Sequence, residues 1–393
     1  MTNARTHTAL TTAVLTALML GPTAQAAYAT SASPAAASVG PSASVSAGAP
    51  RTPSPGPDVA ALEAALVGIP DGDVSAALVR VGGVGTWKGT AGVRDRRTHA
   101  PALENARFRA GSTTKVVTAS LVLQLVAEGK VDLDTPVSHY LPGLLPASFT
   151  ELPTVRHLLT FTSGLQAGPG LGSTTEEMYA NRFRTLTPQE VVAGAVAKGP
   201  AAAPGTRQKY QNIDYTVLGL LIEGVTGDRY AHQAQQRVLR PLGMRHTGFP
   251  VGGDPRIHGP HNRAYADIGG RTRDVTEWNM SDRWAAGDMV STTADLERLL
   301  VGLFQGRVVP EYLLDQMLTV PDLDGAQYGM GLQRFRYNNT EIWGKTGSRP
   351  GYHTVLAATR DLSRTVVYSV NAKSAREDGF PLVARFALPA FNR

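Results

Sequence analysis

The sequence predicts an α+β (α/β) domain in which the two ends of the folded chain form one antiparallel sheet, with flanking helices and a mostly helical lobe. Near the front, residues 75–95 alternate and are punctuated by glycines, which is typical of a two-stranded hairpin. Near the end, four successive stretches between residues 328 and 372 have strand patterns. Residues 131–294, between them, are mostly helices and long loops. Strands at both ends with helices between them predict a single sheet beside a helical insert.

Further helices flank the predicted sheet. A first helix covers residues 58–68, two more cover 295–306 and 311–320, and a closing helix covers 375–391. The segment "VVTASLVLQLVAEG", at 116–129, is apolar on nearly every face. We therefore expect this helix to lie inside the domain.

The first 57 residues do not have the amino-acid composition of a folded domain. Residues 1–29 hold one arginine, a short apolar run and small-residue triplets that end at Ala26 and Ala29, which indicates a secretory signal peptide. An Ala/Thr-rich start without a targeting role is the alternative. Residues 30–57 are rich in Pro, Ala and Ser, which predicts a disordered linker. We expect a secreted, extracellular protein without a membrane span in its mature form, whose folded domain covers residues 58–393.

Composition and charge exclude several functional classes. The 393 residues contain no Cys, which excludes disulfides, a cysteine nucleophile and cysteine-bound zinc. The net charge is +6 and the charged residues are spread along the chain without a Lys/Arg block, so no nucleic-acid partner is expected. His258 and His261 could be metal ligands, but there is no H-E-x-x-H pattern and no helically spaced acidic partner. A loop is the better interpretation, and no metal site is expected.

One S-x-x-K sequence, Ser112-Thr-Thr-Lys115, lies at the start of the apolar helix. Residues three apart share a helix face, so Ser112 Oγ and Lys115 Nζ can meet. The free backbone N–H groups at a helix N-terminus favour developing negative charge. Burial would lower the pKa of the lysine and make it a usable base. The alternative is an N-cap serine with a lysine that extends to solvent.

Tyr210 and Asn212 come just before a second apolar helix, which begins near Tyr215. Alternate residues of an extended turn point the same way, so both side chains could enter one site. A tyrosine close to a lysine ammonium could lose its proton more easily and act as a general base. An asparagine side chain could hold a substrate amide. The alternative is a capping asparagine beside a core tyrosine.

The third motif, Lys345-Thr346-Gly347, lies on a predicted strand. Gly347 would let a ligand approach the backbone, while Lys345 and Thr346 would offer a charge and a hydroxyl. The same stretch also resembles the end of a phosphate-binding loop. That interpretation fails because Asn339 stands where such a loop needs a glycine, and the next segment is a strand.

The three motifs occur in order along the chain, and this set resembles penicillin-binding proteins and serine β-lactamases. The element Y-x-N stands where class A enzymes have S-D-N, which points to the class C-like branch. The resemblance covers nearly all of residues 58–393, through "FRAGSTTK", "TVRHLLTFTSGL", "PGTRQKYQNIDYTVLGLLIEGVTG", "WAAGDMVSTTADL" and "YGMGLQRF". The chain most resembles secreted actinomycete D-alanyl-D-alanine carboxypeptidases, which implies a DD-peptidase/β-lactamase-like fold and no cofactor.

The resemblance implies a role for each motif residue. Ser112 is expected to be the nucleophile that forms an acyl-enzyme, and Lys115 and Tyr210 to share the base and acid roles. The residues expected to contact the substrate are Asn212, Lys345, Thr346, Gly347, Ser348 and Trp284. The backbone N–H groups of Ser112 and Ser348 would form the oxyanion hole. For Trp284, an ordinary core position is the alternative.

Some positions depart from those carboxypeptidases. The third motif begins with Lys345 where they have histidine, and Gln333 replaces the arginine that binds the terminal carboxylate of their substrate. Arg334 follows, but on a strand we expect it to face the other way. Our hypothesis is that Lys345, helped by Arg349, supplies the missing positive charge.

These observations predict a serine hydrolase that attacks an acyl-D-alanyl-D-alanine or a similar amide, forms an ester on Ser112 and passes it to water. The expected activity is that of a monomeric D-alanyl-D-alanine carboxypeptidase that acts on peptidoglycan-type peptides and binds β-lactams. Alternatives are a class C-like β-lactamase, an esterase or D-amino-acid amidase, and a non-catalytic penicillin-binding protein, which the intact motifs disfavour. Phe161 and Asp288, which replace a common histidine and a small residue, have no explanation at this level.

Overall fold

The computed structural model describes residues 56–375 and 379–392. The predicted signal peptide, 1–29, and residues 30–55 of the predicted linker lie outside these ranges, so both stay predictions. Within the described ranges, every helix is too short or too polar to cross a lipid bilayer.

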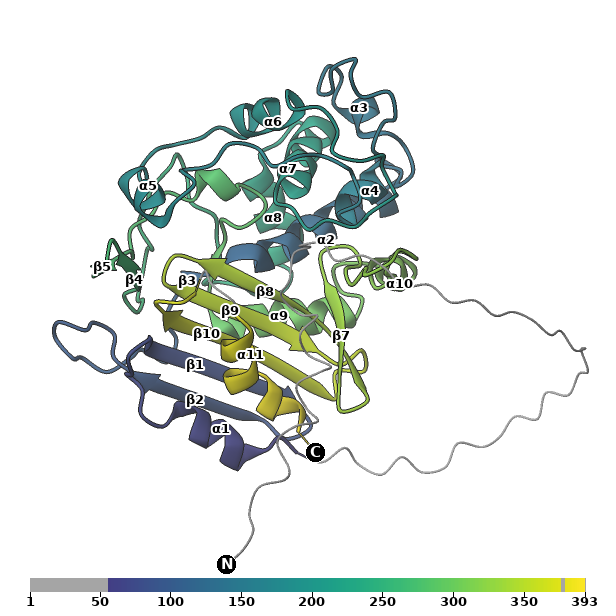
Figure 1. The fold of residues 1–393 in the computed structure, drawn as a ribbon. Coiled ribbons are helices and arrows are strands. Elements are labelled where there is room, and N and C mark those ends of the chain that lie inside the picture. Colours follow the sequence, from purple (N-terminus) through teal and green to yellow (C-terminus); the bar gives the residue numbers. More distant parts are fainter. Residues whose placement is uncertain (1–55, 376–378, 393) are drawn as a thin grey trace, which may run out of the picture.

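A six-stranded antiparallel sheet joins the two ends of the described chain, in the order β2-β1-β10-β9-β8-β7 (Figure 1). Its strands are β1 Val74–Gly83, β2 Trp87–Gly92, β7 Gln333–Tyr337, β8 Thr340–Arg349, β9 Tyr352–Ala358 and β10 Arg364–Ala372. Strand β1 pairs with β10, with Val79 opposite Tyr368. All of β10 is buried, which fits the β-branched and aromatic residues at 365–368 of this strand. One sheet built from both chain ends is confirmed.

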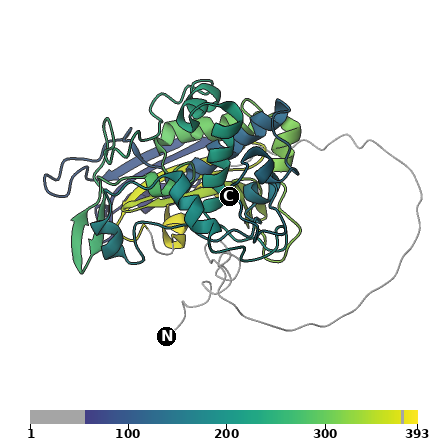
Figure 2. The same cartoon turned by 90° about the horizontal axis from the view of Figure 1, so that it is seen from above.

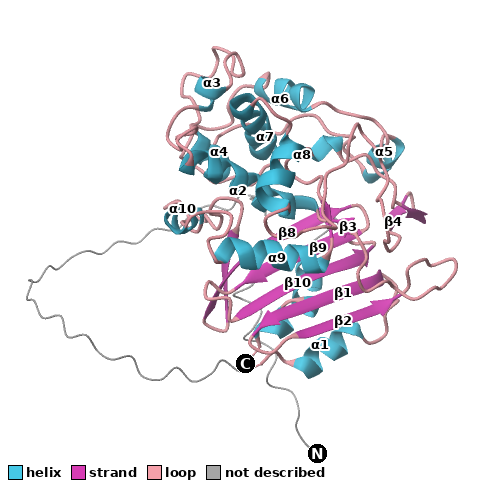
Figure 3. Ribbon diagram, turned by 180° about the vertical axis from the view of Figure 1, so that it is seen from behind, coloured by secondary structure: helices cyan, strands magenta, loops and turns pink. Residues whose placement is uncertain are grey.

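Helices cover both faces of the sheet. On one face, α1 (Val59–Leu66) and α11 (Phe380–Phe386) share a hydrophobic cluster with alternate residues of the central strands. On the other face, α9 (Thr293–Phe304) packs against β10, β9 and β1 (Figure 3). Because side chains of a strand alternate between the faces, this three-layer arrangement buries both sides of the sheet.

The closing helix is shorter than the predicted span of 375–391. It ends at Phe386, and a 3-10 turn, Leu388–Phe391, follows it. Pro389 has no backbone N–H and cannot donate to the carbonyl four residues earlier, so the α-helix does not continue through it.

A lobe of short helices lies above the side of the sheet that carries β8 and β7 (Figures 1 and 2). Its helices are α3 Val137–Tyr140, α4 Val155–Leu159, α5 Thr175–Ala180, α6 Pro188–Val196, α7 Ile213–Thr226 and α8 Tyr230–Ala234. Capping boxes at Thr174 and Thr187 start α5 and α6, where the threonine and a glutamate three residues later satisfy free backbone N–H groups. A further helix, α10 (Glu311–Met317), follows α9.

The lobe segment also holds a small hairpin that lies within the region predicted as helices and loops. Its strands are β4 (Tyr265–Ile268) and β5 (Arg271–Asp274). Most of β5 is exposed and polar, so its sequence lacks an alternating apolar signal. The local signal is the turn Gly269-Gly270, where both residues have the positive φ that tight hairpin turns favour.

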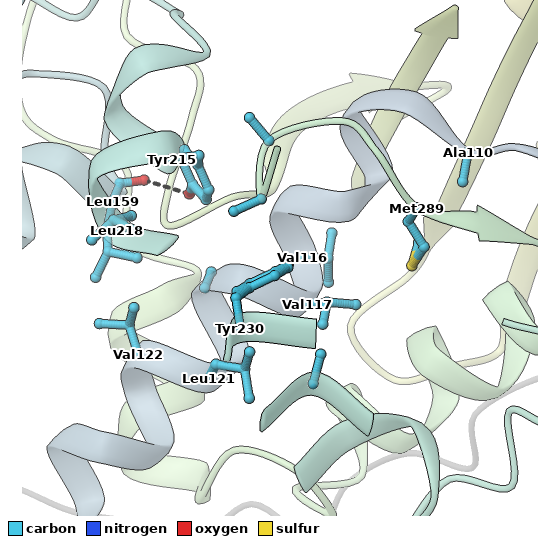
Figure 4. Packing of buried hydrophobic residues seen from close by; sticks show 14 of the residues in the cluster. Ala110, Val116, Val117, Leu121, Val122, Leu159, Tyr215, Leu218, Tyr230 and Met289 are labelled. Atoms are coloured by element: carbon cyan, nitrogen blue, oxygen red, sulfur yellow. Dashed lines mark hydrogen bonds between the residues drawn. The ribbon is translucent and has the colours of Figure 1, made fainter. Parts of the chain in front are cut away.

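Helix α2 (Thr114–Ala127) is buried between the sheet and the lobe, which confirms the expectation of an internal helix. Figure 4 shows Val122 of α2 near Leu218 of α7, and Leu121 of α2 near Tyr230 of α8. Each fully buried Val or Leu contributes about 1.5–3 kcal/mol. This packing holds the first turn of α2 in a fixed position, beside α7 and the end of β8.

Candidate active site

Ser112 and Lys115 lie on consecutive turns at the entry to α2. Ser112 is in a 3-10 turn, Gly111–Thr113, and Lys115 is in the first turn of the helix. The Lys115 Nζ is 3.4 Å from the Ser112 Oγ. Lys115 is fully buried and Ser112 is partly exposed, so the alternative of a lysine that extends to solvent is wrong. The serine hydroxyl is accessible, and the amine lies behind it.

The three polar contacts of the Lys115 Nζ are all to oxygen atoms. Its Nζ donates to Asn212 Oδ1 and to the carbonyl oxygen of Ala286, each at 2.6 Å. Burial lowers the pKa of Lys115 well below its ordinary value, and the nearby charge of Lys345 lowers it further. A neutral amine has two N–H groups and one lone pair. In the neutral form both N–H groups can be engaged by these two acceptors, which leaves the lone pair for the Ser112 hydroxyl, as a general base requires.

The ring of Tyr210 lies between two lysines. Its centroid is 5.0 Å from the Lys115 Nζ and 4.6 Å from the Lys345 Nζ. Burial raises the pKa of the Tyr210 phenol above its ordinary value, and the Ser112 hydroxyl offsets this only in part. Neither lysine is among the groups that lower this pKa, so the structure of the free protein does not support the expectation that a lysine eases deprotonation of Tyr210. Tyr210 is a phenol that can donate a proton.

Phe161 packs against the ring of Tyr210, and this contact gives the phenylalanine at position 161 a structural role. Its ring centroid is 4.7 Å from that of Tyr210, 5.1 Å from that of Tyr215 and 5.2 Å from that of Tyr328. Phe161 is buried and has a φ of 60°, a region that is unfavourable for a bulky residue. Aromatic pairs at such distances contribute about 0.5–1.5 kcal/mol each, which helps to hold this backbone and fixes the orientation of Tyr210.

Lys345 lies on the face of β8 that is turned toward the lobe. Its Nζ donates to the carbonyl oxygen of Thr346 at 3.0 Å. Burial lowers the pKa of Lys345 to about 7, so the side chain is only partly charged at neutral pH. The Thr346 side chain alternates to the opposite face, where it borders a small cavity with Val383 and Ala387 beside α11. Lys345 and Thr346 therefore do not share a face.

Two glycines let the turn at Ser112 pack directly on β8. A β-carbon at Gly347 would overlap with the Ala110 carbonyl oxygen, and one at Gly111 would lie 2.6 Å from the Ser348 nitrogen. This turn therefore requires the glycine of the third motif, and the expectation that a ligand also approaches the backbone there stays a prediction. The same contact brings the backbone nitrogens of Ser112 and Ser348 together, the pair expected to form the oxyanion hole.

One edge of β8 is open beside these groups. Strand β7 pairs with residues 340–344 of β8, and no strand in the described part of the chain continues that pairing along residues 345–349. Ser348, in this open stretch, is exposed. An extended substrate can pair with such an edge through backbone hydrogen bonds.

Arg349 is not available to a substrate carboxylate. Its Nη2 donates to Asp282 Oδ1 at 2.9 Å, and both side chains are buried. Separating a buried ion pair leaves an uncompensated charge and costs about 3–5 kcal/mol. The hypothesis that Arg349 helps Lys345 to bind a carboxylate is therefore wrong.

The register of β7 also corrects the expected orientation of two side chains. Gln333 lies opposite Gly344, and Arg334 lies opposite Trp343. Trp343 and Lys345 are two residues apart on one strand and share a face. Arg334 therefore lies on the face of Lys345 and is exposed, whereas Gln333 faces the layer that contains α11.

Trp284 and Asn212 have structural partners. The ring of Trp284 packs against Gly219 of α7 and lies 5.4 Å from the ring of Tyr230, which supports the alternative of a packing residue. Asn212 makes no side-chain cap on α7, because its Oδ1 accepts the hydrogen bond from Lys115. Its direct structural effect is to orient the amine of Lys115.

Two buried carboxyl groups, Asp214 and Asp288, affect the pKa of Lys115, and neither has a role predicted from the sequence. Asp214 accepts a hydrogen bond from the Ser163 hydroxyl, and burial raises the pKa of Asp214 to about 8. Burial raises the pKa of Asp288 to about 7. The charges of both groups favour the protonated form of Lys115, against the larger effect of burial. The only sequence signal for Asp214 is an acidic residue inside an apolar helix.

The two histidines considered as metal ligands are engaged elsewhere. His258 Nε2 is 2.7 Å from Asp254 Oδ2, and His261 Nδ1 is 2.8 Å from the Gly259 carbonyl oxygen. Over residues 56–375 and 379–392, no three His, Cys, Asp or Glu side chains gather in a way that could hold a metal ion.

Known protein sequences resemble this chain. A family model described as Beta-lactamase matches residues 59–387. The putative penicillin-binding protein PbpX of Bacillus subtilis (strain 168) is 26% identical over 305 residues, which is 76% of this chain and 71% of that protein. Esterase EstB of Burkholderia gladioli is 34% identical over 184 residues, but the chain matches only 47% of the esterase and the match covers 45% of this chain.

Solved structures match over more of the chain. The D-stereospecific amidohydrolase from Streptomyces sp. has a TM-score of 0.73 and 32% identity, with 84% of this chain and 99% of that chain covered. The D-amino acid amidase from Ochrobactrum anthropi SV3 has a TM-score of 0.71 and 26% identity, with 85% and 98% covered. These likenesses agree with the serine and lysine geometry at the entry to α2. The chain belongs to the Beta-lactamase family and is a serine hydrolase of the β-lactamase and penicillin-binding protein group.

Proposed function

We propose that the protein is a D-stereospecific serine hydrolase that cleaves amide or ester bonds through an acyl-enzyme on Ser112. The observation that carries this proposal is the set of contacts at Lys115. Two acceptors can engage both N–H groups of the neutral amine, which leaves its lone pair for the third contact, the Ser112 hydroxyl at 3.4 Å. A serine beside a neutral, oriented amine is an activated nucleophile.

The reaction follows from the positions of these groups. Ser112 Oγ attacks the substrate carbonyl carbon and passes its proton to the Lys115 Nζ. The backbone N–H groups of Ser112 and Ser348 stabilise the oxyanion. The Tyr210 phenol then donates its proton to the leaving amine or alkoxide and regains one from the lysine. A water molecule next attacks the ester on Ser112, with the same groups acting in reverse.

The charge near the open edge of β8 favours substrates without a terminal carboxylate. Lys345 is only partly protonated at neutral pH, and Arg349 is held by Asp282. Amino-acid amides and esters present a neutral leaving group that needs no cation. Similarity to a D-stereospecific amidohydrolase and a D-amino acid amidase supports the D configuration of the residue that is acylated.

A D-alanyl-D-alanine carboxypeptidase is the second candidate. The observation in its favour is that Arg334 is exposed on the same face as Lys345. A bound carboxylate would also raise the pKa of Lys345 and complete its protonation. Two cations would then replace the single arginine whose position Gln333 occupies. A β-lactamase uses the same groups but must also hydrolyse its acyl-enzyme quickly.

One panel of substrates tests both candidates. The purified protein is given D-phenylalanine amide, L-phenylalanine amide, p-nitrophenyl acetate, an N-acyl-D-alanyl-D-alanine peptide and benzylpenicillin, with Ser112→Ala beside it. We expect the D-amide and the ester to be hydrolysed and the L-amide to be spared. Release of D-alanine at a higher kcat/KM than amide turnover would select the carboxypeptidase. Equal turnover of both amide enantiomers would reject the D-stereospecific proposal.

We also propose that the protein is exported and acts as a monomer. The support is the signal-peptide pattern of residues 1–29 and the linker composition of residues 30–57. Expression of the full chain with a C-terminal tag in a Gram-positive host should release it to the medium, shortened by 26 or 29 residues. Removal of residues 2–29 should retain it in the cell. Light scattering should give the mass of one chain.

A further inference from the structure

A cavity of about 150 Å³ opens on the surface, and its lining is basic. The basic residues that line it are Arg107, Arg245, His246, Arg256 and His258. None of the residues that line it is an acidic residue, and none belongs to the group around Ser112. Two of these residues, Arg256 and His258, belong to the segment "RIHGPHNR", which the hydrolase site does not use.

Arg107 is held in place at the cavity. Its Nη1 donates to the His258 carbonyl oxygen at 2.8 Å, and its Nη2 is 3.4 Å from His246 Nδ1. A β-carbon at Gly259 would lie 3.2 Å from the guanidinium, so the backbone there packs directly on it. A guanidinium fixed in this way loses little conformational entropy when it binds a ligand.

The cavity has an excess of positive charge. Within the described part of the chain, Arg107 and Arg245 form no ion pair with a carboxylate, while Arg256 and His258 share Asp254. Hydrogen bonds from Arg256 and His258 hold the pKa of Asp254 well below its ordinary value. The basic side chains of the cavity thus already stabilise one negative charge, that of the Asp254 carboxylate.

One further carboxylate lies behind the cavity wall and is already neutralised. Asp295 accepts hydrogen bonds from the backbone N–H of His246 at 2.8 Å and from the Thr247 hydroxyl at 2.9 Å. Its other oxygen accepts from Arg298 Nη1 at 2.6 Å. The excess charge of Arg107 and Arg245 thus remains available to a ligand.

We propose that this cavity is a binding site for a phosphate group. Planar guanidinium groups match the oxygens of a phosphate, and a cluster of them is unsuited to a metal cation. Phe249, Pro250 and Val290 form an apolar wall beside the arginines, so the site fits the phosphate of an organic ester better than free phosphate. The site is separate from the proposed hydrolase activity and does not depend on it.

Isothermal titration of the whole protein, in a buffer without phosphate or sulfate, tests the proposal. The probes are inorganic phosphate, glycerol 3-phosphate and phenyl phosphate. We expect saturable binding that weakens as salt increases, with phenyl phosphate the tightest because of the apolar wall. Equal affinity for all three would assign the site to free phosphate. No saturable binding of any of the three would overturn the proposal.

Two variants locate the binding. Arg107→Gln should weaken it about tenfold or more, because a charged hydrogen-bond donor is lost. Gly248→Val leaves every charge in place and adds a side chain where no atom lies within 4 Å of the position of a β-carbon, so it should block the cavity. Arg271→Gln, at an exposed arginine of β5, is the matched control and should bind as the parent does. Unchanged binding in both cavity variants, with unfolding temperatures like the parent, would also overturn the proposal.

Discussion

The Lys115 Nζ lies 3.4 Å from the Ser112 Oγ, and its two shorter contacts go to oxygen acceptors on other elements. Asn212 stands at the start of α7, and Ala286 lies in the loop before β6 (Val290–Ser291). Three separate segments therefore determine which way the lone pair of the amine points. The catalytic function of Lys115 should therefore depend on whether its amine is neutral, more than on the size of the side chain.

Replacement of Lys115 by arginine tests that dependence. Arginine stays protonated and offers no lone pair, so the Lys115→Arg variant should lose general-base catalysis, about 10²–10⁴-fold in the acylation rate. The measurement is the rate of p-nitrophenol release from p-nitrophenyl acetate, together with the mass of the intact protein after exposure to benzylpenicillin. Ser112→Ala should form no adduct at all. An acylation rate within threefold of the parent in a folded Lys115→Arg variant would show that another group is the base.

The pKa of Lys345 predicts a pH dependence that differs between substrate classes. Burial lowers this pKa to about 7, so the side chain is charged below pH 7 and loses its charge as the pH rises through 7. For a peptide with a free terminal carboxylate, kcat/KM should therefore fall above pH 7. For an amino-acid amide, which needs no cation, it should not fall over the same range.

A Lys345→Arg variant is the control for this prediction, because arginine keeps its charge. The kcat/KM of this variant for the carboxylate substrate should stay constant from about pH 6 to about pH 9, the range over which Lys345 loses its charge in the parent. Parallel profiles for both substrates in the parent would mean that Lys345 does not bind the carboxylate.

Gly347→Ala should be strongly destabilising. The new β-carbon would overlap with the Ala110 carbonyl oxygen, which belongs to the turn that carries Ser112. Forcing an extra carbon into a packed contact costs about 1–3 kcal/mol, and here the displacement also separates the two nitrogens of the oxyanion hole. Both the unfolding temperature and the rate of acylation should decrease. Gly170→Ala is the matched control, because it meets no atom within 4 Å and should leave both unchanged.

Much of the fold is predictable because its signals are local. The glycine-punctuated hairpin becomes β1 and β2, and the four strand patterns near the end become β7 to β10. The apolar stretch after Lys115 is the buried helix α2, because a helix without a polar face has no position at a surface. The hairpin β4–β5 has no such apolar signal, and only its Gly-Gly turn marks it.

The site is less predictable because its properties arise from contacts between distant segments. Spacing places Ser112 and Lys115 together, but the number of acceptors around the amine depends on Asn212 and Ala286. The proton affinity of Tyr210 was expected to follow from one neighbouring charge, whereas burial has the larger effect. The orientation of Arg334 depends on strand register, which a sequence pattern does not determine at an edge strand.

Asp288 should make the stability of the protein depend on pH. Burial raises its pKa from 3.8 to about 7, so the folded state binds a proton more tightly than the unfolded state between these values. The contribution of the protonated carboxyl to stability is fully present below pH 4 and is lost as the pH rises to 7. An Asp288→Asn variant keeps a side chain of the same shape without a charge. Its free energy of unfolding, relative to the parent, should therefore increase between pH 4 and pH 7 and stay constant above.

Urea unfolding of both proteins at several pH values measures this difference. The exposed residue Asp324 provides a matched control, because water solvates its carboxylate in both states, and Asp324→Asn should give a much smaller change with pH. A difference between Asp288→Asn and the parent that stays constant from pH 4 to pH 8 would contradict the prediction, and would mean that the charges of Lys115 and Arg349 compensate the buried carboxylate in the folded state.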